Sequence, residues 1–265
     1  MTYNTLTLSE PAPGVVLATL NRPHRSNAIT FEMFDEFVRL QKDVDENTDA
    51  RVLILTGAGR AFCAGLDLDH VAELSTMSAE EMLVGQTHWA ASVTGFHTMA
   101  TPVIAAVNGA AAGAGMGLAL AADIRIASSA ARFNAAFVKV GLSGGDVGSS
   151  YLLPRIIGTG PATEILLTGS FVDAHHAHRI GLVTSLVEPE ELLGRALDIA
   201  LDICANSPIG MRLTKEVLRV NATAPSLESA LSVENRNQVL ATRTSDMTEA
   251  LNAFRNKRAP VFTGR

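Results

Sequence analysis

The segment from Pro102 to Ala122 contains no charged side chain and is long enough to cross a bilayer. Asn108-Gly109 divides it with a strong turn signal, and glycine and alanine outnumber the larger aliphatic residues. Transfer of such a segment into lipid would therefore gain little free energy, and we predict no membrane span. The sequence instead favours a buried strand over residues 103–107, a turn, and then a helix.

The predicted helix begins in Gly113-Ala114-Gly115, where side chains are almost absent. The first N–H groups of a helix have no partner within it and carry the positive end of the helix dipole, so an open helix start can bind a ligand oxygen. A dinucleotide-binding loop would need a further glycine at position 118, which is leucine. We therefore expect no nicotinamide cofactor.

A second loop with few side chains, from Gly57 to Leu68, follows a strand predicted over residues 52–56. Backbone N–H groups from two such loops can form the paired donors that stabilise an oxyanion, and losing one donor raises a barrier by about 3 to 4 kcal/mol. Two ordinary turns would give the same pattern. Both interpretations are open from the residues alone.

Several ordered blocks of the chain resemble the enoyl-CoA hydratase/isomerase (crotonase) family. They are residues 21–28 (NRPHRSNA), 61–67 (AFCAGLD), 102–109 (PVIAAVNG), 113–115 (GAG), 122–127 (ADIRIA), 153–158 (LPRIIG), 167–169 (LTG) and 178–183 (HRIGLV). The match covers nearly the whole chain. The resemblance implies an α/β fold built as a spiral of ββα repeats, with acyl-CoA thioesters as substrates.

Composition is consistent with this class of protein. The chain has 265 residues, of which 47% are hydrophobic, and so can bury a full core. A formal net charge of −6, with no run of lysine or arginine, argues against nucleic acid or an anionic membrane as a partner. Residues 1–11 lack the apolar stretch of a signal peptide, so we expect a cytoplasmic protein.

The cysteines and histidines do not predict a metal site. Cys63 and Cys204 are far apart in the chain and fit a reducing compartment better than a disulfide framework. His175, His176 and His178 are close together, but no cysteine lies near them, and we predict that they lie on a short exposed helix. We therefore expect no metal.

The chain divides into two parts by its pattern of elements. Predicted strands over residues 15–20, 52–56, 103–107, 124–127 and 182–187 alternate with helices, as is typical of α/β proteins. After Pro189 the sequence predicts only helices, over residues 190–205, 208–220, 226–242 and 245–258. We predict a core over residues 1–189 and a C-terminal helical module over residues 190–265, and the resemblance implies that the core binds acyl-CoA and that the helical module serves trimerisation. The resemblance implies a homotrimer or a hexamer made of two trimers.

The resemblance also assigns candidate site residues. The two backbone N–H groups with which the family holds the thioester oxygen correspond here to Leu66 and Ala114. Coenzyme A would lie against a loop with three basic residues, although solvated charges on a turn would look the same. The predicted substrate-binding residues are Arg22, His24, Arg25, Ala64, Asp67, Gly113 and Phe137. Asp67 is also a candidate acid, but the resemblance implies that this position caps the following helix. Coenzyme A is part of the substrate, so no separate cofactor is expected.

The departures from the family are more informative than the matches. Family hydratases use two glutamates to hold and split water, and the matching positions here are Gly117 and Phe137. Neither side chain can transfer a proton, so ordinary hydration is not expected. Asp146 remains nearby, in a loop that carries the acid of several family isomerases, displaced here by about one residue. We predict that Asp146 moves a proton between two carbons of the acyl chain. Alternatively, Asp146 caps a helix that begins near Gly148.

Four other functions are open at this point. The run from Gly141 to Gly145 matches the GxSxG of hydrolases, but glycines follow Ser143 where a helix is required. A family dehalogenase uses a histidine and a tryptophan beside its aspartate, and the matching residues here are Ala90 and Phe137. The remaining alternatives to isomerisation are hydration by non-standard acid and base residues and non-catalytic binding of acyl-CoA.

Overall fold

The computed structural model describes residues 2–265 and contains two sheets. The larger sheet has the strand order β1-β2-β3-β5-β7-β10, and the smaller has the order β4-β6-β8-β9. The strands are β1 (Leu6–Ala12), β2 (Val15–Leu20), β3 (Val52–Gly57), β4 (Ala61–Cys63), β5 (Val103–Val107), β6 (Ala110–Ala112), β7 (Ile124–Ser128), β8 (Arg132–Asn134), β9 (Val172–Asp173) and β10 (Ser185–Val187). β1 pairs antiparallel with β2, and β8 with β9; the other pairs are parallel.

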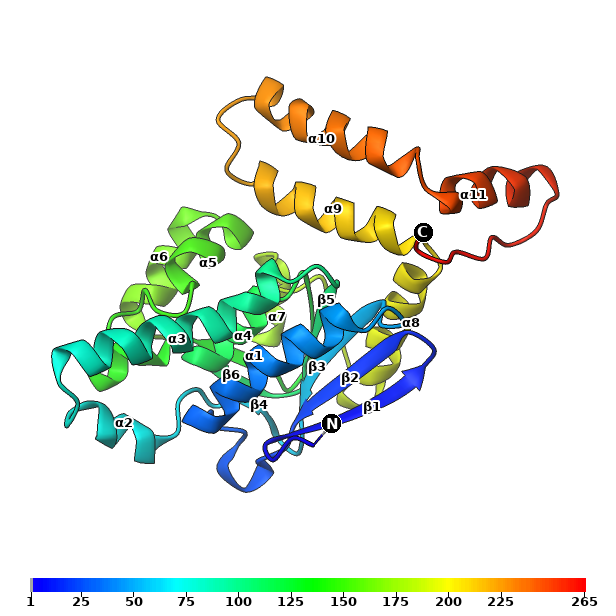
Figure 1. The fold of residues 1–265 in the computed structure, drawn as a ribbon. Helices are drawn as coiled ribbons and strands as arrows, with labels where there is room; N and C mark the ends of the chain where they lie inside the picture. The colour runs from blue at the N-terminus through cyan, green and yellow to red at the C-terminus, as the bar shows by residue number, and fades with distance from the viewer. Residues whose placement is uncertain (1) are drawn as a thin grey trace.

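From β3 to β8, successive strands alternate between the two sheets. β3, β5 and β7 lie in the larger sheet, and the short strand after each of them lies in the smaller sheet. A helical segment follows each pair: α2 (Leu68–Leu74) with α3 (Ala79–Thr98), then α4 (Ala114–Ala121), then the 3-10 turn η2 (Ala136–Val140) with α5 (Ser149–Ile157) and α6 (Thr159–Thr168). The chain is therefore a spiral of ββα repeats, which confirms the predicted fold (Figure 1).

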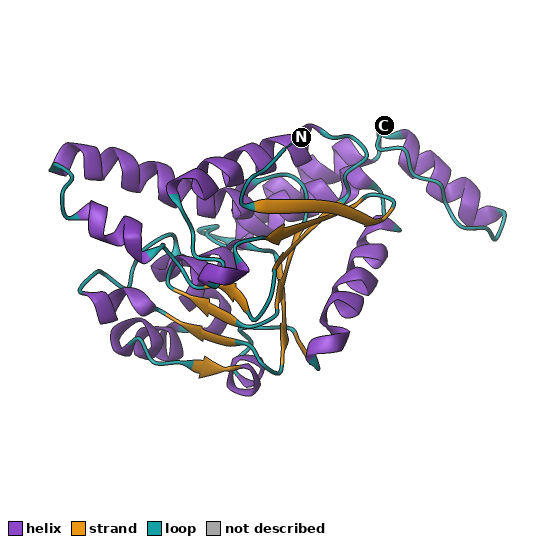
Figure 2. Cartoon of the chain, turned by 90° about the horizontal axis from the view of Figure 1, so that it is seen from below, coloured by secondary structure: helices purple, strands orange, loops and turns teal. Residues whose placement is uncertain are grey.

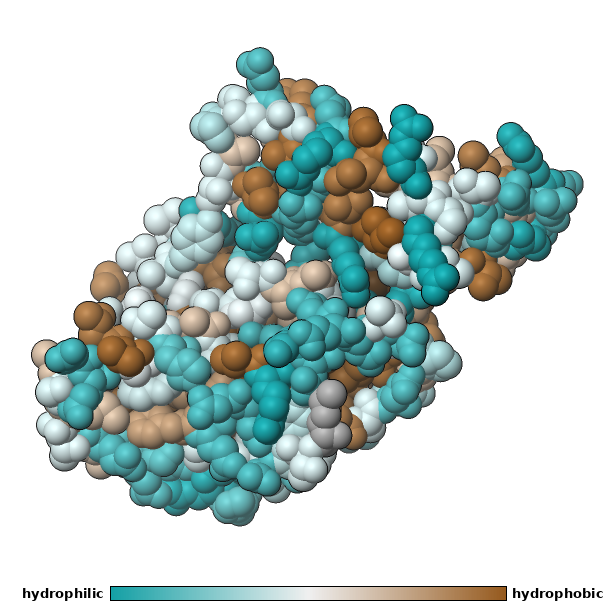
Figure 3. All heavy atoms as spheres, viewed as in Figure 1, coloured by the Kyte–Doolittle hydropathy of each residue, from teal (hydrophilic) through white to brown (hydrophobic). Residues whose placement is uncertain are grey.

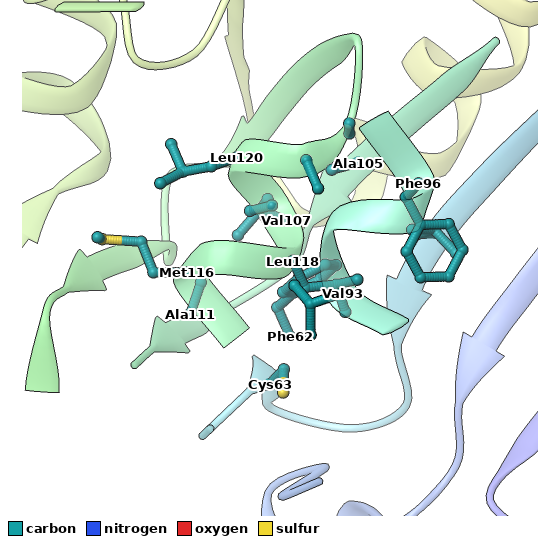
Figure 4. Close-up of a cluster of buried hydrophobic side chains, with 14 of the residues drawn as sticks. Phe62, Cys63, Val93, Phe96, Ala105, Val107, Ala111, Met116, Leu118 and Leu120 are labelled. Carbon is teal, nitrogen blue, oxygen red and sulfur yellow. The ribbon is translucent and has the colours of Figure 1, made fainter. Parts of the chain in front are cut away.

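The core occupies both faces of the larger sheet. β3 and β5 are buried along their whole length, as expected for aliphatic strands in a parallel sheet with helices on each side. On one face, α8 (Leu192–Cys204) packs Leu192, Ala196 and Ala200 against the sheet (Figure 2). The opposite face belongs to a larger apolar cluster that includes α1 (Phe31–Glu46), α3 and α4. Figure 4 shows side chains of β4, α3, β5, β6 and α4 gathered in this cluster.

Two asparagines hold the turn between β3 and β4. Asn27 Nδ2 donates to the carbonyls of Ala58 and Ala61, at 2.9 and 2.8 Å. Asn108 Oδ1 accepts from the Gly57 N–H at 3.1 Å, and its Nδ2 donates to the Gly59 carbonyl at 3.0 Å. These two asparagines of the family-like blocks therefore fix the turn that leads into β4.

The last three helices extend away from the sheets (Figure 1). They are α9 (Pro208–Asn221), α10 (Leu227–Ala241) and α11 (Ser245–Arg255), and α10 packs against α9. Lys215 anchors α9 to the core: its Nζ lies 2.8 Å from Asp123 Oδ2 and donates to the Thr101 carbonyl at 2.9 Å. α8, which belongs to the helical module predicted from residue 190, packs on the sheet, and α9 to α11 lie farther out.

Some predicted elements differ from the structure. The helix predicted to begin in Gly113-Ala114-Gly115 is confirmed as α4, which begins at Ala114, but the strand β6 between Asn108-Gly109 and this helix was missed. The small sheet was missed because strands of two or three residues have no detectable periodicity. β1 was missed because its residues after Leu6 are mostly exposed. The histidine-rich helix is confirmed as α7 (Ala174–Arg179), and its three histidines are exposed.

Within residues 2–265, no helix combines the length and apolar character needed to cross a membrane.

Candidate active site

A cavity of about 450 Å³ opens between α2, α3, the start of α4 and the loop that joins η2 to α5. Most of its lining is apolar. The lining residues are Phe34, Ala64, Gly65, Leu66, Leu68, Val71, Leu74, Met82, Gln86, Trp89, Gly113, Ala114, Ala136, Phe137, Val140, Leu142, Ser143, Gly145, Asp146 and Val147. Asp146 is the single titratable side chain among these residues. Of the predicted site residues, Ala64, Leu66, Gly113, Ala114, Phe137 and Asp146 are therefore brought together here.

The two predicted donor loops lie side by side. β4 and β6 are parallel neighbours, so the loops after them leave the same edge of the small sheet. A Cβ added at Gly65 would lie 3.4 Å from the Ala114 backbone nitrogen, which shows how closely the loops approach. Neither the Leu66 nor the Ala114 N–H donates a hydrogen bond to any residue that the structure describes. Both donors are therefore free, and both residues line the cavity.

The glycines near these donors allow close packing of backbone. A Cβ at Gly115 would lie 2.1 Å from the Cys63 carbonyl oxygen, so only glycine lets α4 pack this tightly against β4. Gly65 has φ +91°, and a Cβ added to it would lie 2.7 Å from the Ala112 carbonyl oxygen. From the sequence, ligand access alone explains these glycines. The structure shows that close contact between the two loops also requires them.

Asp146 lies half-buried on the loop between η2 and α5. Its Oδ1 accepts from Gln86 Nε2 at 2.5 Å and from the Val147 N–H at 2.7 Å. Burial raises the pKa of Asp146, and these two hydrogen bonds only partly oppose that effect. The N-cap of α5 is Gly148, without a side-chain hydrogen bond, so the alternative assignment of Asp146 as a helix cap is wrong.

Val147 fills the space beside Gly117. A Cβ at Gly117 would lie 2.4 Å from Val147 Cγ2, so no larger side chain fits there without movement. Val147 is buried at φ +40°, an uncommon conformation for a β-branched residue. The site therefore has no room for the glutamate that family hydratases carry at the position of Gly117 unless Val147 moves. For the same reason, Gly117→Glu is not expected to introduce a hydratase-like glutamate without displacing Val147.

We expect Gly117→Ala to lower the free energy of unfolding by about 1 to 3 kcal/mol, because its Cβ would overpack this contact. Urea denaturation measures the change. Gly160→Ala is the matched control, since a Cβ on that helical glycine has no heavy atom within 4 Å, and it should be neutral or slightly stabilising. A Gly117→Ala protein as stable as the wild type would contradict the packing assigned to Val147.

The predicted coenzyme A loop is held by Asp67. Arg22 Nη1 lies 2.8 Å from Asp67 Oδ2 and donates to the Ala28 carbonyl, and Arg25 Nη2 lies 2.9 Å from Asp67 Oδ1. Burial alone would raise the pKa of Asp67, but bonds from the two arginines and the Asp69 N–H lower it to about 2. Asp67 is also the N-cap of α2, as its sequence position predicted. His24 is exposed in the 3-10 turn η1 (Pro23–Arg25).

Other sequence candidates are resolved by their positions. Ser143 follows η2 and is separated from α5 by several residues, so the strand-serine-helix elbow of a hydrolase is absent from this loop. The large apolar residues Met82, Phe96, Phe133, Phe137 and Trp89 suggest an apolar acyl pocket in the sequence; Met82, Trp89 and Phe137 line the cavity, whereas Phe96 and Phe133 belong to the core. Sequence reasoning missed Gln86, whose 60-residue separation from Asp146 leaves no local pattern.

Comparisons with known proteins identify the family of this chain. The family model for enoyl-CoA hydratase/isomerase matches residues 10–265. The chain belongs to the enoyl-CoA hydratase/isomerase family. A relative named probable enoyl-CoA hydratase from Mycobacterium bovis is 39% identical, over 99% of this chain and 94% of that protein. A 1,2-epoxyphenylacetyl-CoA isomerase of Escherichia coli is 38% identical, over 97% of this chain and 98% of that protein.

Solved structures show the same fold. An enoyl-CoA hydratase from Bacillus anthracis superposes with a TM-score of 0.92 at 34% identity, covering 99% of this chain and 100% of that one. A monofunctional enoyl-CoA isomerase from M. smegmatis has a TM-score of 0.72 at 41% identity, covering 86% and 98%. The relatives thus include proteins named hydratase and proteins named isomerase.

Proposed function

We propose that this protein moves a double bond along the acyl chain of an enoyl-CoA thioester. In this proposal Asp146 is the acid and base, and the N–H groups of Leu66 and Ala114 stabilise the thioester oxygen. The observation that carries the proposal is the cavity lining, in which Asp146 is the single titratable side chain among the described residues. One carboxylate is sufficient for a 1,3 proton shift, whereas water addition needs a base for water and an acid for carbon.

The proposed reaction converts a 3-enoyl into a 2-enoyl thioester. Asp146 accepts the proton from C2, and the electron pair of that C–H bond moves toward the thioester oxygen to give a dienolate. The N–H groups of Leu66 and Ala114 stabilise this oxygen more strongly as it gains negative charge, so they lower the barrier. The protonated Asp146 then returns the proton to C4, the carbonyl re-forms, and the double bond lies between C2 and C3.

The environment of Asp146 supports this role. Burial raises the pKa of its carboxyl, which makes the carboxylate a stronger base. Phe137 and Leu142, which line the same cavity, cannot hold a water molecule by hydrogen bonds from their side chains. The cavity therefore suits an apolar acyl group and a proton shift more than attack by water.

Hydration of crotonyl-CoA is expected to be slow, well below about 10 per second, the median turnover of enzymes. The reason is that neither Gly117 nor Phe137 can orient water. The loss of the 2-enoyl thioester absorbance measures hydration, and 3-hexenoyl-CoA on the same enzyme sample measures isomerisation. Crotonyl-CoA hydration as fast as isomerisation would favour the hydratase alternative, in which Asp146 acts on water.

Arg22, His24 and Arg25 are proposed to contact the coenzyme A part of the substrate. Arg22 is already held by Asp67 and the Ala28 carbonyl, so its side chain cannot turn freely toward a phosphate. His24 is exposed and has no ion-pair partner among the described residues, whereas Arg25 is exposed but paired with Asp67 and Asp69, so His24 is the freest of the three for such a contact. A protein that binds acyl-CoA without turnover is the remaining alternative.

We also propose that the protein assembles into a trimer or hexamer, as the family resemblance implies. Many large apolar side chains on the C-terminal helices are exposed, and Figure 3 shows hydrophobic residues on this part of the surface. They are Leu218, Val220, Leu227, Leu231, Val239, Leu240, Met247, Leu251 and Phe254. Exposed apolar surface of this extent is typical of a protein interface.

A further inference from the structure

Asp146 is hydrogen-bonded through only one of its two oxygens. Gln86 Nε2 and the Val147 N–H both donate to Oδ1, and no described residue donates to Oδ2. We infer that Gln86 is a positioning residue: it holds Oδ1 of Asp146 and leaves Oδ2 as the oxygen that exchanges protons with the acyl chain. This inference rests on the proposed function and adds to it the residue that orients the base.

Gln86 is placed for this role by the geometry of α3. Met82, Gln86 and Trp89 follow one another at intervals of four and three residues, so they lie on one face of the helix. All three line the cavity. The helix therefore fixes the position of the Gln86 amide in the cavity wall, within hydrogen-bonding distance of Asp146.

The second donor comes from the loop itself. Val147 adopts φ +40°, and its N–H donates to the side chain of the residue before it. This single bond from a neighbouring backbone N–H fixes the carboxylate less firmly than two bonds from separate elements would. The amide of Gln86, which approaches from another element, supplies the second bond. The two donors together define which oxygen points into the cavity.

A neutral donor suits a base better than a cation would. Lysine or arginine at position 86 would strongly favour the ionised carboxylate and so weaken it as a base. The neutral amide of Gln86 opposes the effect of burial on Asp146 only in part. Gln86 can therefore orient the Asp146 carboxylate without making it a weak base.

The test is Gln86→Met, which keeps the length of the side chain and removes the donor. We expect kcat for 3-enoyl-CoA isomerisation to fall about tenfold with KM nearly unchanged, and the acid limb of the pH profile to move up by about one unit. Gln41→Met is the matched control: Gln41 donates from α1 to the Ser92 carbonyl at 2.6 Å, away from the cavity, and its loss should change neither quantity.

A second variant and a direct titration keep the inference testable. Gln86→Glu places a carboxylate beside Asp146, so the acid limb should move further up than in Gln86→Met. A ¹³C NMR titration of the Asp146 carboxyl in wild type and Gln86→Met measures the same shift without turnover.

Failure of the inference differs from failure of the proposed function. If Gln86→Met has the wild-type kcat, pH profile and Asp146 titration while Asp146→Asn is inactive, Gln86 does not position the base, and the proposed function stands. If Asp146→Asn is fully active, the assignment of the base fails, and with it the role of Gln86.

Discussion

Replacing Asp146 by asparagine is expected to lower the rate of 3-enoyl-CoA isomerisation by about a hundred- to ten-thousandfold, the range for loss of a general acid and base. Asparagine has nearly the same shape, and its carbonyl oxygen can still accept from Gln86 and the Val147 N–H. Its amide nitrogen cannot accept a proton. Binding of a saturated acyl-CoA and the melting temperature should therefore stay close to the wild-type values.

Asp198→Asn is the matched control for this substitution. Asp198 is an exposed carboxylate on α8, which packs on the sheet away from the cavity. Its replacement makes the same chemical change and should leave kcat unaltered. Equal isomerisation rates in wild type and Asp146→Asn would remove Asp146 from the mechanism.

Replacing Ala114 by proline is expected to lower turnover by about a hundredfold or more, because it removes one of the two donors to the thioester oxygen. The substitution suits this position unusually well. Ala114 is the first residue of α4, where proline is tolerated because the missing N–H has no partner within the helix. The loss should appear in kcat more than in KM, since the donor acts mainly on the charged transition state.

Ala114→Gly is the control, because glycine keeps the N–H and only removes a methyl group. We expect it to retain most of the wild-type turnover. The melting temperature of Ala114→Pro shows whether α4 still folds. A folded Ala114→Pro protein with unchanged turnover would exclude this N–H from the oxyanion hole.

The long buried elements were predictable because their signals are local. The strand predicted over residues 103–107 coincides with β5, and those at 15–20, 52–56 and 124–127 agree with β2, β3 and β7 within one residue. Aliphatic runs bounded by turn residues produce such strands in any sheet covered on both faces. The spiral order of these strands, by contrast, came from the family resemblance.

The finer geometry of the site depended on contacts between distant residues. Arg22 and Arg25 look like free cations in sequence, yet both bind Asp67, more than 40 residues away. The contact of Val147 with Gly117 and that of Gln86 with Asp146 likewise join separate elements. Residue spacing carries no information about such pairs, so the structure was needed to find them.

The central claim is that one carboxylate moves a proton between C2 and C4 of a polarised acyl chain. The most direct measurement follows a 3-enoyl-CoA that carries deuterium at C2, incubated with the protein in H₂O and analysed by NMR and mass spectrometry. The account predicts formation of the 2-enoyl thioester with deuterium transferred to C4, in an amount lowered only by exchange of the protonated Asp146 with water, and loss of this reaction in Asp146→Asn. Formation of a 3-hydroxyacyl-CoA as the main product, or no double-bond migration by the wild type across a panel of 3-enoyl thioesters, would contradict it.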